Sequence, residues 1–179
     1  MFNKIALSLL TASLLCGAAY AKELSFKEGF IGAQTEIFGD SNINPKSSQI
    51  VTKLNMDDTI ESLKGDISLE LLSLKSDNEK RDEHMYEALH VKAHPSTTFK
   101  LKEVNKKADG YHLIGVLTLN KQTKEIDTKA DITDQSDLLK LKGAFSIKMS
   151  EFGIEPPTLL FLSVRDEVVI TYDLTLAKN

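Results

Sequence analysis

The chain contains no tryptophan and a single cysteine, Cys16. Cys16 lies in an apolar N-terminal stretch that we expect to be removed, which leaves the mature protein without a thiol. Disulfide bonds, thiolate metal sites and thiol catalysis are therefore excluded from the mature chain. A mature protein of this kind depends on its hydrophobic core alone for stability.

The sequence also lacks an excess of basic charge, a second long apolar run and the motifs of common enzymes. Its formal net charge is −4 at pH 7, which disfavours nucleic acid and anionic lipid surfaces as partners. After residue 21 no stretch approaches the roughly 18 apolar residues of a membrane span, so we expect no stable membrane insertion. There is no Gly-x-Ser-x-Gly motif and no glycine-rich phosphate loop, and nothing in the residues indicates an enzyme.

Residues 1–21 have the pattern of a secretory signal peptide: one positive charge, an uncharged apolar run, then Ala-Tyr-Ala. The small residues predict cleavage after Ala21. We therefore expect a periplasmic protein with a single domain over residues 22–179. In an alternative, Cys16 would be the lipid-modified cysteine of a lipoprotein, but Leu15 is bulky where that signal has a small residue.

Most of the mature chain alternates apolar and polar residues, which is typical of half-buried strands. We predict eight strands, at residues 29–39, 47–56, 65–74, 96–104, 111–120, 124–133, 143–150 and 167–176. Residues 40–42 are predicted to form the turn after the first of them. Short strands separated by turns favour a mainly β fold, an antiparallel barrel or sandwich. A barrel of eight strands either fills itself with side chains or holds one small ligand.

The segment KSDNEKRDEHMYEALH, residues 75–90, departs from this alternation. Ser76 followed three residues later by Glu79 matches a capping box at the start of a helix, and Pro95 prevents a long continuation. The apolar residues of the segment share one helical face: Met85, Ala88 and Leu89. We therefore predict one short amphipathic helix, over about residues 77–90, that covers one end of the barrel.

Several short blocks occur in a characteristic order: RDEHM (81–85), HPSTTFK (94–100), GVLTL (115–119), TKEI (123–126), EFGI (151–154) and DEV (166–168). In order and spacing they resemble the YceI-like family of lipid- and polyisoprenoid-binding proteins, over about residues 60–176. The resemblance implies an eight-stranded antiparallel lipocalin-like barrel with the helix at its rim. It also implies a long-chain lipid or isoprenoid as the partner, and makes a homodimer possible.

The predicted inward faces of the strands are almost wholly apolar. Periodicity alone leaves open whether they form a filled core or the wall of a cavity, and the family resemblance favours a cavity. The candidate ligand-binding residues are Leu69, Leu71, Phe99, Leu101, Leu113, Leu117, Leu119, Phe145, Ile147 and Ile170, with His84 as a polar group at the mouth.

The predicted function is to sequester or carry a long-chain amphiphile, namely a polyisoprenoid, an isoprenoid quinone or a fatty-acid-like lipid. No metal and no cofactor besides the bound lipid is expected. One alternative is a barrel with a filled core that acts through its surface, in stress protection or adhesion.

A further alternative is a metal-dependent hydrolase built on His84, His90 and His94. A helical zinc pair needs two histidines four residues apart on one face. His90 and His94 have that spacing, but Pro95 disfavours helical backbone at His94.

We therefore expect zinc titration of the mature protein, followed by calorimetry, to show no binding tighter than micromolar. The histidines at a solvated helix end offer no preorganised set of ligands. Stoichiometric binding at or below that concentration would favour the hydrolase alternative.

Overall fold

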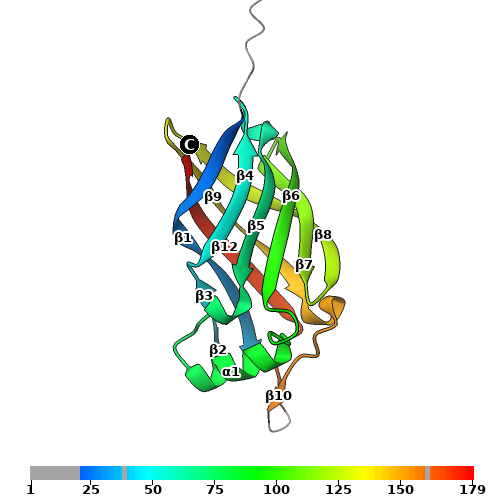
Figure 1. Cartoon of the computed structure of the whole chain (residues 1–179). Coiled ribbons are helices and arrows are strands. Elements are labelled where there is room, and N and C mark those ends of the chain that lie inside the picture. Colours follow the sequence, from blue (N-terminus) through cyan, green and yellow to red (C-terminus); the bar gives the residue numbers. More distant parts are fainter. Residues whose placement is uncertain (1–20, 38–39, 160–161) are drawn as a thin grey trace, which may run out of the picture.

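The computed structural model describes residues 21–37, 40–159 and 162–179. Residues 1–20 of the predicted signal peptide lie outside the described residues, so its cleavage stays a prediction. The long strands wind around a common axis, and one α-helix lies across one end of them (Figure 1). The strands are β1 (Lys22–Ile37), β2 (Asp40–Ile43), β3 (Lys46–Ser47), β4 (Ile50–Met56), β5 (Lys64–Glu70), β6 (Ser96–Lys107), β7 (Gly110–Leu119), β8 (Gln122–Asp134), β9 (Leu138–Lys148), β10 (Thr158–Leu159), β11 (Leu162–Ser163) and β12 (Glu167–Lys178); the helices are η1 (Ile60–Ser62), η2 (Leu71–Ser73), α1 (Glu79–Ala88) and η3 (Met149–Phe152).

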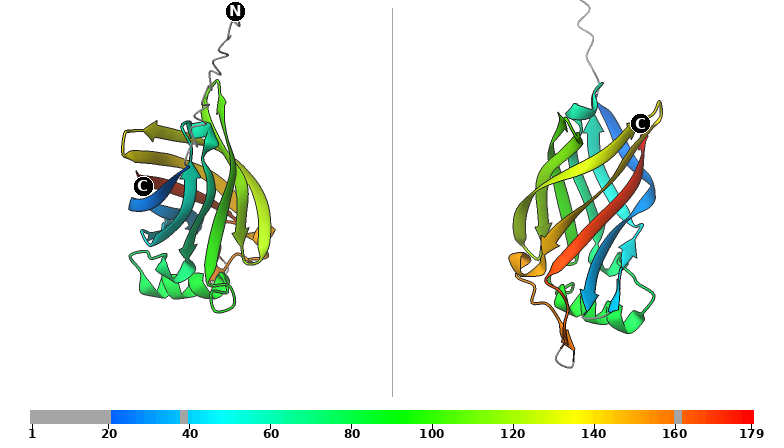
Figure 2. Two further views of the ribbon diagram at one scale, coloured as in Figure 1. Left: turned by 45° about the horizontal axis from the view of Figure 1, so that its top comes forward. Right: turned by 180° about the vertical axis from the view of Figure 1, so that it is seen from behind.

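Eight of these strands form a closed antiparallel barrel in the order β1-β4-β5-β6-β7-β8-β9-β12. The ring closes because β12 pairs with β1 over a long register, from Leu24 opposite Lys178 to Gln34 opposite Val169. Strands that follow one another along the chain are neighbours in the sheet, and their common tilt around the axis is visible from two further directions (Figure 2). The predicted fold class is confirmed.

All eight predicted strands are present, but several of their boundaries were wrong. The largest differences are at the first strand, at the third and at the seventh, β9, which begins at Leu138 rather than at residue 143. The first strand begins at Lys22 rather than at residue 29, because its N-terminal part pairs with β12 and β4. The predicted turn at residues 40–42 is instead strand β2, which pairs with β1. The third strand ends at Glu70, where the chain enters the 3-10 helix η2 and the Leu71 amide donates to the Pro95 carbonyl at 2.7 Å.

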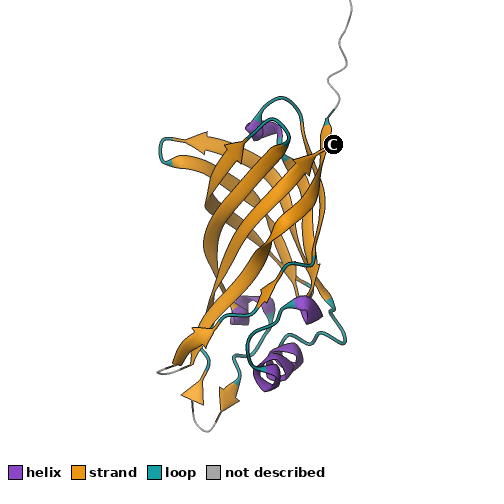
Figure 3. Ribbon diagram, turned by 90° about the vertical axis from the view of Figure 1, so that its left-hand side faces the viewer, coloured by secondary structure: helices purple, strands orange, loops and turns teal. Residues whose placement is uncertain are grey.

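The inward side chains form two buried clusters. The 3-10 helix η1 lies at one end of the barrel, and α1 lies at the other end (Figure 3). The closed-end core lies at the end of the barrel where η1 is located. Its members are Leu24, Ile50, Leu54, Met56, Leu63, Ile67, Leu101, Val104, Leu113, Ala130, Leu139, Leu141, Tyr172, Leu174 and Leu176. The mouth core lies at the end covered by α1 and consists of Leu69, Leu71, Leu74, Val91, Leu117, Leu119, Ile147, Phe152, Ile154 and Val168.

Asp166 attaches η3 to the start of β12. Its carboxylate accepts hydrogen bonds from the Ser150 amide at 2.8 Å and from the Ser150 hydroxyl at 2.5 Å. The same hydrogen bonds, that of the hydroxyl first, lower the pKa of Asp166 below its usual value. Because η3 carries the fully buried Phe152, this attachment helps to hold one side of the mouth core in place.

We expect Asp166→Asn to lower the melting temperature at neutral pH, since the amide carries no charge for the two Ser150 donors. A carboxyl group whose folded pKa is lowered stabilises the fold above its unfolded pKa, about 3.9, and loses that contribution as the pH falls through the folded value. The difference between wild type and variant should therefore shrink below about pH 4. Calorimetric melting across this pH range measures it.

The matched control is Glu167→Gln, at the exposed neighbouring position, which should melt like the wild type. A deficit of Asp166→Asn that stays constant across the pH range would contradict this account of the Asp166 charge.

Candidate functional site

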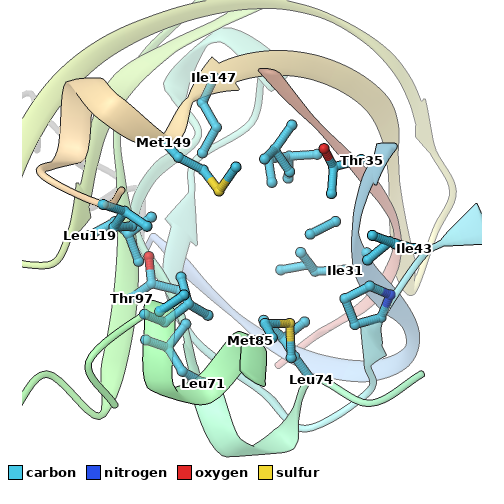
Figure 4. A pocket seen from close by; sticks show the side chains of 18 of the residues that line it. Ile31, Thr35, Ile43, Leu71, Leu74, Met85, Thr97, Leu119, Ile147 and Met149 are labelled. Carbon is cyan, nitrogen blue, oxygen red and sulfur yellow. The ribbon is translucent and has the colours of Figure 1, made fainter. Parts of the chain in front are cut away.

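A cavity of about 1000 Å³ lies inside the barrel, between the closed-end core and α1. The side chains around it come from strands on every side and from the helix, as the labelled residues Ile31, Leu119, Ile147 and Met85 illustrate (Figure 4). Most lining residues are leucine, isoleucine, valine, methionine or phenylalanine. The volume is at the upper end of the range for small-molecule sites, so the interior suits a large apolar guest.

The floor of the cavity is formed by side chains that also belong to the closed-end core. These floor residues are Ile67, Leu113, Leu141, Tyr172 and Leu174. Nearer α1 the wall is formed by the mouth core, and the rim by α1 and by the loop over residues 154–158. The cavity thus has an inner end bounded by the closed-end core and a rim made of one helix and one loop.

Ten of the eleven predicted site residues line this cavity: Leu69, Leu71, His84, Phe99, Leu113, Leu117, Leu119, Phe145, Ile147 and Ile170. The prediction for Leu101 was wrong. Leu101 is 2% exposed and lies in the closed-end core beyond the floor, because it is one alternation further along β6 than Phe99. Contact between the other ten residues and a ligand stays a prediction.

The predicted lining does not include the wall that β1 and the segment after it contribute. Ile31, Ala33 and Thr35 line the cavity from alternating positions of β1, and Ile43 and Pro45 extend the same wall. The alternation of β1 was a usable signal, but small and polar side chains on its inner face weakened the apolar pattern.

The charged residues of the cavity lining, among the described residues, all lie at the rim, where His84 also lies: Lys80, Arg81 and Glu87 on α1, and Glu155 in the loop. Both signs of charge are present, and Arg81 also pairs with Asp77 at 3.6 Å. His84 therefore lies at the mouth as predicted. His90 and His94 are absent from the lining, and within the described part of the chain no three His, Cys, Asp or Glu side chains are grouped to hold a metal ion.

The predicted capping box was wrong, because the N-cap of α1 is Asn78. The Asn78 side chain accepts a hydrogen bond from the Arg81 amide at 3.1 Å. The Ser76 hydroxyl is instead bound to the Asp82 carboxylate at 2.6 Å. The helix is also shorter than predicted and ends at Ala88.

Two side chains on one side of α1 attach the helix to the chain just after η2. Asp82, 6% exposed, accepts the Ser76 amide with both carboxylate oxygens at 3.0 Å, in addition to the Ser76 hydroxyl. Tyr86 donates to the Leu74 carbonyl at 2.6 Å, and burial, followed by the Asp82 charge, raises the pKa of Tyr86. The apolar stripe of the helix faces the cavity: Met85, Ala88 and Leu89.

These contacts make α1 a rim element that covers the cavity without entering the closed-end core. Neither α1 nor any other described helix is long and apolar enough to cross a membrane.

A model of the YceI-like domain matches residues 24–176 of the chain. A UPF0312 protein of Pectobacterium atrosepticum is 33% identical over 146 residues, which cover 76% of this chain and 76% of the relative. Among solved structures, BcnA of Burkholderia cenocepacia superposes with a TM-score of 0.72 at 16% identity, covering 82% of this chain and 95% of BcnA. A polyisoprenoid binding domain of Saccharophagus degradans gives 0.68 at 10% identity, covering 88% and 98%. At these identities the two structures show a shared fold.

We expect Asp82→Asn to loosen α1, because the new amide group presents a donor to the Ser76 amide where the wild type has only acceptors. Hydrogen bonds to a charged group contribute about 1.5–3 kcal/mol each, so hydrogen exchange across residues 79–88 should become faster. Exchange followed by mass spectrometry measures this directly.

Glu83→Gln is the matched control, since Glu83 is exposed on the same helix and its loss of charge should leave exchange unchanged. Equal exchange in wild type and Asp82→Asn would show that Asp82 does not hold the helix.

Proposed function

The chain belongs to the YceI-like family, and from this premise we propose that it is an exported, periplasmic protein that binds a long-chain amphiphile inside its barrel. The class of ligand is a polyisoprenoid, an isoprenoid quinone or a fatty-acid-like lipid. The observation that carries the proposal is the apolar cavity of about 1000 Å³ with the closed-end core at its floor and a helix at its rim. The structural neighbour described as a polyisoprenoid binding domain supports the same class of guest.

The affinity would come from burial of the chain of the ligand. Each CH₂ group removed from water contributes about 0.8 kcal/mol, so a chain of about a dozen carbons supplies on the order of 10 kcal/mol before ordering costs. Few polar contacts are then needed, and selectivity would depend on cavity length and on the polar groups at its two ends. This mechanism is binding and sequestration, and it requires no catalytic group.

The alternatives have less support. A filled-core barrel requires an interior packed with side chains, and the cavity argues against it. A metal-dependent hydrolase requires a cluster of ligands, which the described residues do not bring together. Export rests on the N-terminal pattern, and a homodimer on the family resemblance alone.

Native mass spectrometry of the protein, purified from a periplasmic fraction after expression of the full-length chain, tests both parts of the proposal. We expect a mature chain that begins at Lys22 and carries a stoichiometric long-chain adduct, which solvent extraction and lipid analysis identify. A clean apo mass that persists after incubation with quinones, polyprenols and fatty acids would contradict lipid binding.

A pair of variants tests whether the adduct lies inside the cavity. Ala33 lines the cavity from β1, whereas its neighbour Gln34 is exposed. Ala33→Trp should fill part of the cavity and reduce the adduct to a minor fraction, while Gln34→Trp should keep it because the added ring lies outside. Equal adduct on both variants would place the lipid elsewhere on the protein.

A further inference from the structure

The hydroxyl of Tyr172 is the one buried side-chain oxygen or nitrogen that has no hydrogen-bond partner among the described residues. Tyr172 lies on β12, is 8% exposed and forms part of the cavity floor. Buried polar groups in folded proteins are nearly always paired, since an unpaired one destabilises the fold. An unpaired donor in the floor of a ligand cavity therefore points to a partner that the ligand supplies.

The neighbouring strand provides space for this phenol but no polar partner. Gly143 on β9 lies directly opposite Tyr172 in the sheet. A Cβ atom at Gly143 would come within 2.3 Å of the Tyr172 oxygen, so any larger residue there would displace the ring. Gly143 thus leaves the space that the phenol occupies, and the phenol proton has no partner among the described residues.

The threonine hydroxyls of the cavity wall differ from the Tyr172 hydroxyl, because each of them donates a hydrogen bond to a backbone carbonyl of the barrel. Thr35 donates to the Glu167 carbonyl at 3.0 Å, Thr97 to the Thr118 carbonyl at 2.9 Å and Thr128 to the Ala144 carbonyl at 3.0 Å. These threonines can only accept a further hydrogen bond. The Tyr172 hydroxyl, in contrast, is available to donate one.

The phenol keeps this proton over the physiological range. Burial raises the pKa of Tyr172 to about 12, and the Thr128 hydroxyl opposes that rise only in part. No hydrogen bond of ordinary geometry joins Thr128 to the Tyr172 oxygen. The floor therefore presents a neutral O–H group.

Charge distribution along the cavity limits which ligand atoms this group can bind. The charged residues that line the described cavity are on α1 and at Glu155, all at the rim. Tyr172 is four residues deeper along β12 than Val168 of the mouth core, which is about 13 Å of strand. A phosphate or carboxylate at the floor would be a buried charge without a counter-ion, which is strongly unfavourable, whereas a neutral carbonyl oxygen suits a single donor.

We propose that the Tyr172 hydroxyl donates a hydrogen bond to a neutral acceptor oxygen of the bound amphiphile, so that the ligand lies with its uncharged head at the floor and its chain toward α1. The proposal rests on the lipid-binding function and adds the class and the orientation of the head group: a carbonyl-bearing head such as that of an isoprenoid quinone, rather than a polyprenyl phosphate or a fatty-acid anion. Neighbouring atoms cover the Tyr172 oxygen in the structure, so the proposed bond requires the phenol to rotate toward the cavity when the ligand binds.

The test compares Tyr172→Phe with the wild type, using ubiquinone-2 as the carbonyl-bearing probe and squalene as the hydrocarbon probe. Loss of one hydrogen bond should weaken ubiquinone-2 binding about 5- to 10-fold and leave squalene binding within about 2-fold, since burial of apolar surface is unchanged. The melting temperature of the variant should be equal or higher, because an unpaired buried hydroxyl has been removed.

The matched control is Tyr111→Phe, on β7, since Tyr111 packs against the closed-end core without lining the cavity. It should change neither affinity. Infrared spectra add an independent readout: the carbonyl band of bound ubiquinone-2 should lie at lower frequency in the wild type than in Tyr172→Phe, because hydrogen bonding weakens the C=O bond.

Unchanged quinone affinity with an unchanged carbonyl band would overturn the proposal and place the head group at the rim. Equal weakening of both probes would also overturn it, since Tyr172 would then act through packing. Wild-type protein that binds squalene but not the quinone would overturn the head-group assignment and leave lipid binding standing. Binding of neither probe would overturn the head-group assignment and the floor site. If fatty acids and polyprenols also failed to bind, the carrier function would be overturned as well.

Discussion

Pairing of β1 with β12 is the interaction on which the rest of the structure depends. It turns an antiparallel sheet into a closed barrel of eight strands, in which every strand has two neighbours and no long edge remains exposed. Closure also sets the diameter of the interior, since strand number, tilt and stagger are linked. The apolar face of each strand then has no alternative but to face the same enclosed space.

This space is filled unequally along the barrel. At one end η1 and the leucine-rich closed-end core occupy it, and Leu24, Leu139 and Leu176 are fully buried there. At the other end α1 lies at the rim, where Asp82 and Tyr86 attach it to the chain after η2. Because these bonds are made on one side of the helix, its apolar stripe covers the interior without filling it, and a cavity remains between the two levels.

The two ends of the cavity offer different chemistry. The rim carries both signs of charge and remains close to water, so it can meet any polar group of a ligand at modest cost. The floor is apolar except for the Tyr172 phenol, which Gly143 accommodates, and the nearby Thr128 hydroxyl, which donates to the Ala144 carbonyl. An amphiphile in such a site is bound mainly through its chain, and its orientation depends on a small number of polar atoms.

The sequence by itself determined the eight strands of the barrel and which of their faces is apolar, because alternation is a local property that each strand carries in its own residues. It also determined that one short amphipathic helix interrupts the strands, and the ordered blocks from residue 81 to residue 168 indicated the family. These features account for the barrel and for ten of the eleven predicted lining residues.

Tertiary structure alone decided the depth of each residue and its polar partners. Phe99 and Leu101 share one face of β6, yet Phe99 lines the cavity and Leu101 lies in the closed-end core, because the height of the floor depends on how all eight strands are staggered. Ser76 met the pattern of a capping residue, but the buried Asp82 binds its hydroxyl and Asn78 caps the helix. Local sequence specifies the direction of a side chain, whereas depth and hydrogen-bond partners depend on residues that only closure of the barrel brings together.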